Sequence, residues 1–144
     1  MNHIVLPGVT LALVLGLFFY IVNARKKTML HYIFTGILIA LMVWVIAVLL
    51  QALNSENARL VLAFENLTYL GSAVIPVCLL ILGLVYGGSG TGLSWKIPLL
   101  LVIPAITQVM VWTNGYHHLF YVSYSLDTGF VPGLYFYFHA AYSY

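Results

Sequence analysis

Long apolar runs alternate with short polar connections along this chain. Four of the runs come close to the roughly 20 residues that a helix needs to cross the hydrocarbon of a membrane. None shows the alternation of apolar and polar residues that marks a membrane-spanning strand, and backbone in lipid must satisfy its own hydrogen bonds, so we predict helices. The predicted full spans cover residues 4–22, 30–53, 60–86 and 97–113, and a partial fifth span covers 134–144.

The connections between the predicted spans are short, so consecutive helices should be antiparallel neighbours. We therefore predict an all-α, polytopic transmembrane helix bundle that forms a single domain over residues 1–144. Pro76, Pro98 and Pro104 fall within predicted spans and can kink them, because proline leaves a backbone carbonyl without its partner. The fifth run would reach only about 16 Å, half of a bilayer, so we expect either that the chain is truncated within this span or that partners cover it.

The composition supports a membrane environment. Hydrophobic residues make up 63% of the 144 residues and charged residues only 6%, whereas soluble domains carry roughly 25% charged residues. The lipid bilayer is therefore the first predicted partner. No broad basic face is present, which excludes a nucleic-acid partner. The single cysteine, Cys78, lies in an apolar run and has no partner for an intrachain disulfide.

The distribution of lysine and arginine predicts the orientation. Arg25, Lys26 and Lys27 lie in the first connection and Lys96 in the third, on one side of the membrane, while only Arg59 lies in the second. Cytoplasmic loops carry the excess of positive charge. We therefore predict an integral protein of the prokaryotic inner, or plasma, membrane with its N-terminus outside.

Histidine, amide and phenol side chains are concentrated in one stretch, residues 112–121, which follows the fourth predicted span. Glu65, the only acidic residue inside a predicted span, lies at a similar depth near the outer face. A carboxylate within a membrane is a functional hypothesis by default, and the alternative is that it reaches the headgroups or bonds a neighbouring helix. The candidate ligand-binding residues are Glu65, Tyr69, Asn114, His117, His118 and His139.

The same side chains could be viewed as a metal-ligand set, but their spacing is not a metal signature. His117 and His118 are adjacent and cannot easily share one ion, and no helical pair of histidines four residues apart exists. We therefore predict no metal and no cofactor. The histidines would more naturally form hydrogen bonds that fix the loop over the bundle.

Several short segments occur along the chain in an order that resembles a known family. The segments are residues 64–71, Ile75–Pro76, residues 103–107, Thr113–Asn114 with residues 117–121, and Gly133 with residues 137–144. This order is similar to the N-terminal seven-transmembrane region of bacterial and archaeal sensor histidine kinases. The resemblance implies an outside N-terminus and cytoplasmic signalling domains after the seventh span, whereas this chain stops within the fifth.

The resemblance implies a sensory, signal-input module of a histidine-kinase-type receptor. A small ligand or a change of membrane state would act at an outer-leaflet pocket, and a change of helix packing would pass to the cytoplasm. No catalytic domain is present in this segment, although a kinase would follow in a full-length parent. The alternative is a structural accessory subunit of a larger membrane complex, so the partners are either a second copy in a homodimer or other membrane subunits.

Overall fold

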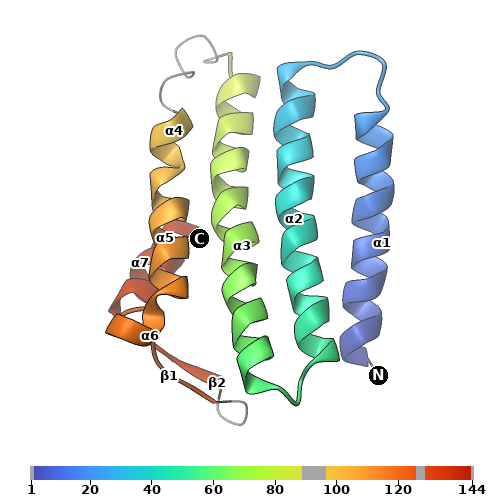
Figure 1. Ribbon diagram of the computed structural model, residues 1–144. Coiled ribbons are helices and arrows are strands. Elements are labelled where there is room, and N and C mark those ends of the chain that lie inside the picture. The colour runs from blue at the N-terminus through green and yellow to red at the C-terminus, as the bar shows by residue number, and fades with distance from the viewer. Residues whose placement is uncertain (1, 89–96, 126–128, 144) are drawn as a thin grey trace.

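The computed structural model describes residues 2–88, 97–125 and 129–143, and it is helical over most of them. Three long helices lie side by side in chain order (Figure 1): α1 (Asn2–Val22), α2 (Met29–Leu53) and α3 (Ala58–Tyr86). Each is long and apolar enough to cross a membrane. The first three predicted spans are thereby confirmed, within a few residues at each end.

Local side chains set where α2 and α3 begin. Thr28 precedes α2, and its backbone N–H donates to Nδ1 of His31, while its hydroxyl lies 2.8 Å from the same atom. Asn57 precedes α3, and its Oδ1 accepts from the backbone N–H groups of Arg59 and Leu60. Such caps satisfy amide groups that have no partner within the first turn.

The prediction of four full spans and a partial fifth was wrong. The fourth run is divided into α4 (Ile97–Leu100) and α5 (Val102–Trp112), which continue one another alongside α3 (Figure 1). Pro104 explains the division, because it cannot donate to the carbonyl of Leu100 and its ring crowds that carbonyl. Pro76 does not interrupt α3, which runs unbroken from Ala58 to Tyr86. The structure therefore has three candidate spans among the described residues, and α5 is a shorter apolar helix.

The all-α prediction also missed a small hairpin after α5. A short helix, α6 (Asn114–His117), leads to strands β1 (Tyr121–Ser125) and β2 (Gly129–Pro132), which pair antiparallel with a shift of register between Tyr121 and Ser123. Helix α7 (Leu134–Ser143) follows and covers the fifth predicted run, except for its last residue, which lies outside the described chain. With ten residues, α7 is too short to cross a bilayer.

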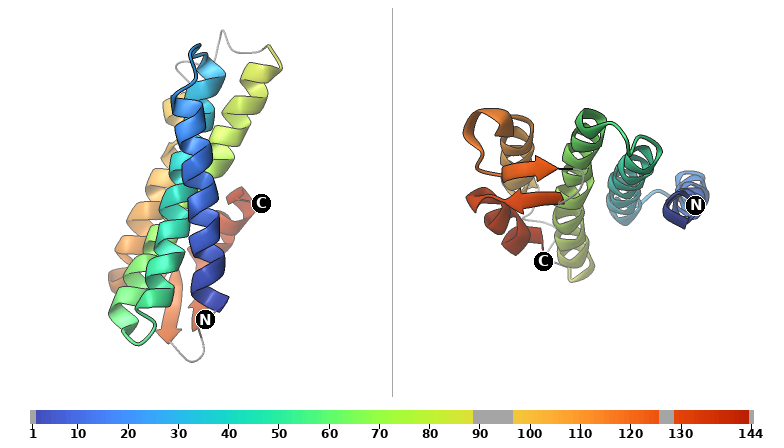
Figure 2. Two further views of the ribbon diagram at one scale, coloured as in Figure 1. Left: turned by 90° about the vertical axis from the view of Figure 1, so that its right-hand side faces the viewer. Right: turned by 90° about the horizontal axis from the view of Figure 1, so that it is seen from below.

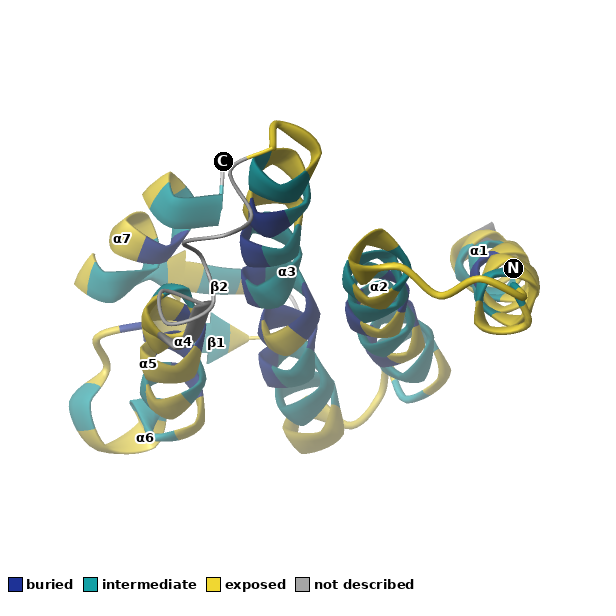
Figure 3. Cartoon of the chain, turned by 90° about the horizontal axis from the view of Figure 1, so that it is seen from above, coloured by how far each residue is buried: buried dark blue, intermediate teal, exposed yellow. Residues whose placement is uncertain are grey.

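Helices α2 and α3 make the closest contact between long helices. A Cβ at Gly71 would lie 2.6 Å from the carbonyl oxygen of Ala40 and 2.7 Å from Cβ of Trp44, so only glycine permits this approach. Figure 3 shows buried residues concentrated on α3, whereas α1 is largely exposed at the edge of the row. Exposed apolar surface of this kind suits contact with lipid.

The bundle has two distinct ends. One end holds the start of α1, the connection between α2 and α3, and the β1–β2 hairpin, and we call it the hairpin end. The other holds the connection between α1 and α2, residues 23–28, with Arg25, Lys26 and Lys27, and we call it the basic end. Viewed from below, the hairpin and α7 lie against the face of α3 that points away from α2 (Figure 2).

Candidate functional site at the hairpin end

The hairpin is anchored to the helices by a cluster of buried aromatic rings. Phe120 is fully buried, and its ring centroid lies 4.8 Å from that of Tyr69 on α3 and 4.9 Å from that of Tyr121. Val111 of α5 completes the buried centre of the cluster. Edge-to-face pairs of this kind add to the stabilisation from buried area. The cluster therefore joins α3, α5 and β1 into one packed unit.

Asn114 fixes the path of the chain between α6 and β1. Its Oδ1 accepts from the backbone N–H groups of Phe120, at 2.8 Å, and Tyr121, at 3.0 Å. Its Nδ2 donates to the carbonyl of Tyr121, at 2.9 Å. One amide side chain thus bonds three backbone groups of Phe120 and Tyr121. Asn114 is a positioning residue for the loop that carries Tyr121.

His117 is held by hydrogen bonds at both ring nitrogens. Its Nδ1 accepts from the backbone N–H of Leu119, at 3.0 Å, so the proton of the neutral ring lies on Nε2. Nε2 then donates to the hydroxyl of Thr113, at 3.0 Å, which itself donates to the carbonyl of Val109. This chain of bonds ties the loop to the end of α5.

His118 differs from His117 in both conformation and exposure. It is the only described residue other than glycine with a positive φ, at 53°, and it ends α6 in the left-handed region. Its side chain is exposed. Side chains held in this region carry a conformational cost and often mark functional sites.

A hollow of about 270 Å³ opens between α3, α5 and the hairpin. Asn66 on α3, Asn114 and His118 near α6, and Tyr121 and Tyr124 on β1 line it together with apolar side chains. The hydroxyl of Tyr121 donates to Oδ1 of Asn66, at 3.3 Å, in a buried position. The hollow therefore has hydrogen-bonding groups on two sides and reaches into the aromatic cluster through Tyr121.

Glu65 and His139 do not line this hollow, and both interact with Tyr69 of α3. The Glu65 carboxyl interacts with Gln51 on α2 and with Tyr69, one turn further along α3. The amide nitrogen of Gln51 is buried and has no hydrogen bond of good geometry among the described residues. His139 of α7 is buried, its ring centroid lies 5.2 Å from that of Tyr69, and its Nδ1 has no partner among the described residues.

The two hairpin tyrosines remain neutral over the physiological range. Burial, followed by the neighbouring Tyr69 and Glu65, raises the pKa of Tyr121 far above that of an ordinary phenol. Burial also raises the pKa of Tyr124, and the negative charge of Glu65 adds to the effect. The Tyr121 hydroxyl is therefore a hydrogen-bond donor at neutral pH, as its contact with Asn66 requires.

The structure divides the six candidate residues into three places. Asn114 and His118 line the hollow, and His117 is bonded within the loop. Glu65 and His139 both interact with Tyr69, the third member of the remaining group. Among the described residues, no three His, Cys, Asp or Glu side chains lie close enough together to hold a metal ion.

Sequence reasoning did not select Asn66, Gln51 or Tyr121 as site residues. Asn66 and Gln51 are amides inside long apolar runs, and that isolation was an available signal. Tyr121 gave no such signal, because tyrosines are abundant near membrane interfaces. Its importance comes from a contact between residues 55 positions apart.

Comparison with known proteins places this arrangement in a family. A family model described as the N-terminal 7TM region of histidine kinase matches residues 6–144, from α1 to the end of α7. No curated protein and no solved structure matches the chain. The match covers nearly the whole chain and confirms the resemblance that the motif residues indicated. The chain therefore belongs to the N-terminal seven-transmembrane region of histidine kinases, the membrane-embedded sensory part of these signalling proteins.

Proposed function

We propose that this region detects a small polar ligand, or a change in the membrane headgroup layer, in the hollow at the hairpin end. The hollow offers amide, imidazole and phenol groups from Asn66, Asn114, His118 and Tyr121. The response is a change of helix packing that is passed along α3 toward the basic end. It can be no larger than the difference in the ligand's affinity for the two packings.

The position of Tyr121 is the observation that carries this proposal. Its ring belongs to the buried aromatic cluster, its hydroxyl bonds Asn66 on a candidate span, and its side chain lines the hollow. An occupant that displaces the Tyr121 hydroxyl leaves the Asn66 amide without that donor and disturbs the packing of Phe120 on Tyr69. Glu65, Tyr69 and His139 then act behind the hollow, where they couple α2, α3 and α7.

A substitution at His118 tests the site in the complete histidine kinase. Glycine accepts a positive φ without strain, so His118→Gly removes the imidazole and keeps the loop conformation. Tyr116→Ala is the matched control, because Tyr116 lies in the neighbouring α6, is 93% exposed and does not line the hollow. We expect His118→Gly, combined with Asn66→Leu, to abolish the stimulus-dependent change in kinase autophosphorylation, and Tyr116→Ala to retain it. A full response from the double variant contradicts the proposal.

The proposal includes an orientation in which the hairpin end lies outside the cell. After Cys78→Ala removes the native thiol, Tyr116→Cys places a single reporter at the hairpin end and Asn23→Cys places one at the basic end without changing a charge. A membrane-impermeant maleimide should label the Tyr116→Cys protein in intact cells and the Asn23→Cys protein only after lysis. The reverse pattern would place the hollow in the cytoplasm and end the proposal.

The alternative, an accessory subunit of a larger complex, makes a different prediction. An accessory subunit should leave gentle detergent extraction together with other chains in a fixed proportion, whereas a sensor region should be recovered alone or as a homodimer. The interior hollow lined by polar groups favours the sensor, because a scaffold helix bundle has no need of it.

A further inference from the structure

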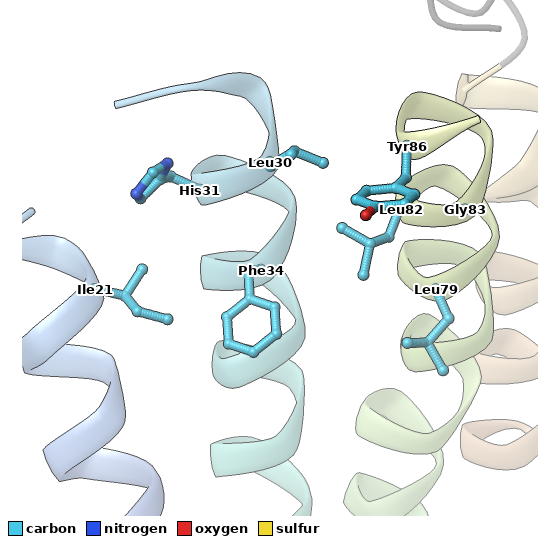
Figure 4. A pocket seen from close by; sticks show the side chains of 8 residues that line it. All are labelled: Ile21, Leu30, His31, Phe34, Leu79, Leu82, Gly83 and Tyr86. Carbon is cyan, nitrogen blue, oxygen red and sulfur yellow. The ribbon is translucent and has the colours of Figure 1, made fainter. Parts of the chain in front are cut away.

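A second concavity, at the basic end, is chemically unlike the hollow. Its volume is about 500 Å³, and α1, α2 and α3 all contribute to its walls. Figure 4 shows Ile21 of α1 facing α2, Phe34 of α2 near the centre, and Leu79, Leu82 and Tyr86 on α3. These side chains are almost entirely apolar. We refer to this concavity as the apolar groove.

The groove is a consequence of how α2 and α3 cross. The two helices touch at Gly71, where a Cβ would collide with Ala40 and Trp44. Toward the basic end α3 leans away from α2, as the left-hand view of Figure 2 shows. Gly83 lies in the separated part, and a Cβ there would meet no atom within 4 Å. The space between α2 and α3 is therefore open at Gly83, and Gly83 lies within a candidate span.

Positive charge and hydrogen-bond donors lie at the mouth of the groove. Ile21 is followed one turn later by Arg25, Lys26 and Lys27, all exposed. His31, which lines the groove, accepts a hydrogen bond from the backbone N–H of Thr28 at Nδ1, so its Nε2 is a donor.

No acidic side chain of the described chain lies at this end. Glu56 is in the connection between α2 and α3, and Glu65 is near the start of α3, both toward the hairpin end. The basic charge is therefore not neutralised by described residues of the protein itself.

We propose that the apolar groove binds an acyl chain of an anionic phospholipid, whose phosphate lies on the cations of residues 23–28. Hydrocarbon fits the apolar walls, and the phosphate accepts hydrogen bonds and neutralises the charge that the described residues leave unpaired. A second copy of this chain is a poorer occupant, since a two-fold contact would bring two basic connections together. The groove shares no lining residue with the hollow at the hairpin end, so this proposal does not rest on the proposed function.

Lipid retention by the purified full-length protein tests the proposal. The protein is extracted into micelles with equal amounts of phosphatidylglycerol and phosphatidylcholine of identical chains, and bound lipids are counted by native mass spectrometry. We expect about a tenfold preference for phosphatidylglycerol, because each nearby cation favours an anionic headgroup. Glycerol phosphate, which has the headgroup phosphate without acyl chains, should not displace the bound lipid.

Two variants distinguish the contribution of the apolar groove to lipid binding from that of the basic side chains. Gly83 lines the groove and a Cβ there meets no atom within 4 Å, so the side chain of Gly83→Leu should occupy the groove and abolish retention of phosphatidylglycerol. Gly16→Leu is the matched control, since Gly16 lies on exposed α1 with equally open space, and it should retain the lipid. Lys26→Gln with Lys27→Gln should keep lipid bound but lose the preference. Equal retention of the two lipids by the unaltered protein, unchanged retention by Gly83→Leu, or displacement by glycerol phosphate alone would overturn the proposal.

Discussion

Replacing Asn114 with alanine should loosen the hairpin from the helices. The substitution removes the acceptor of two backbone N–H groups, those of Phe120 and Tyr121, and the donor to the Tyr121 carbonyl. Phe120 is 0% exposed and Tyr121 2%, so water does not reach them without local opening. An unsatisfied buried group costs about 1–3 kcal/mol. For the two N–H groups together, we expect a loss of about 2–6 kcal/mol in the local stability of the loop.

Amide hydrogen exchange measured by mass spectrometry on a peptide covering residues 118–125 provides the assay. Since 1.4 kcal/mol corresponds to a factor of ten, exchange at Phe120 and Tyr121 should accelerate by at least about 10-fold and by up to about 10⁴-fold. Asn114→Asp keeps the acceptor and loses the donor, so its effect should be intermediate.

Asn54→Ala is the matched control, because Asn54 makes one side-chain bond, to the Leu50 carbonyl, at the end of α2. It should leave exchange in the 118–125 peptide unchanged. If Asn114→Ala and Asn54→Ala gave the same protection in this peptide, the assignment of Asn114 as the residue that holds the loop would be wrong.

Three further predictions concern close packing and ionisation. Gly71→Leu should separate α2 from α3, because its side chain would overlap the Ala40 carbonyl, and the thermal unfolding temperature in micelles should fall by several degrees for each kcal/mol lost (about 2–8 °C). Gly133→Ala should disrupt the start of α7, since a Cβ there overlaps the Leu119 carbonyl, and exchange in residues 133–138 should accelerate. Burial raises the pKa of Tyr121, so the folded state holds its proton more tightly than the unfolded state. The free energy of unfolding should therefore fall as the pH rises above about 10, and Tyr121→Phe should reduce that fall.

The long helices were predictable because their signal is local. Hydrophobic runs bounded by Asn, Lys and Arg fix three spans within a few residues of α1, α2 and α3. The division at Leu101 was within reach of the same reasoning, since Pro104 lies in the fourth run. The high hydropathy of residues 97–113 nevertheless led to the prediction of one continuous span. A run of apolar residues does not show whether its backbone hydrogen bonds are continuous.

The hairpin and much of the site were not predictable in this way. Strand β1 has five residues, two of them serines, and its partner β2 has four, so neither gives a periodic signal of useful length. The bond between Tyr121 and Asn66 and the three bonds of Asn114 depend on a loop conformation that includes a left-handed residue at His118. The residue types present in this region can be read from the sequence, whereas their arrangement in space arises from contacts between distant residues.

In the relay that we propose, helix α3 would connect the two ends of the bundle. Asn66 and Tyr69 lie on it at the hairpin end, Leu79 and Leu82 line the groove near the basic end, and Gly71 lies between them at the contact with α2. A rigid helix that is held tightly near its centre moves its two ends in opposite directions when it tilts. A change at Tyr121 that tilts α3 must therefore alter the width of the groove, and by linkage a lipid that prefers one width must change the affinity of the hollow by the same factor. Gly71 is then more than a packing residue, because a larger side chain there would change both sites while touching neither.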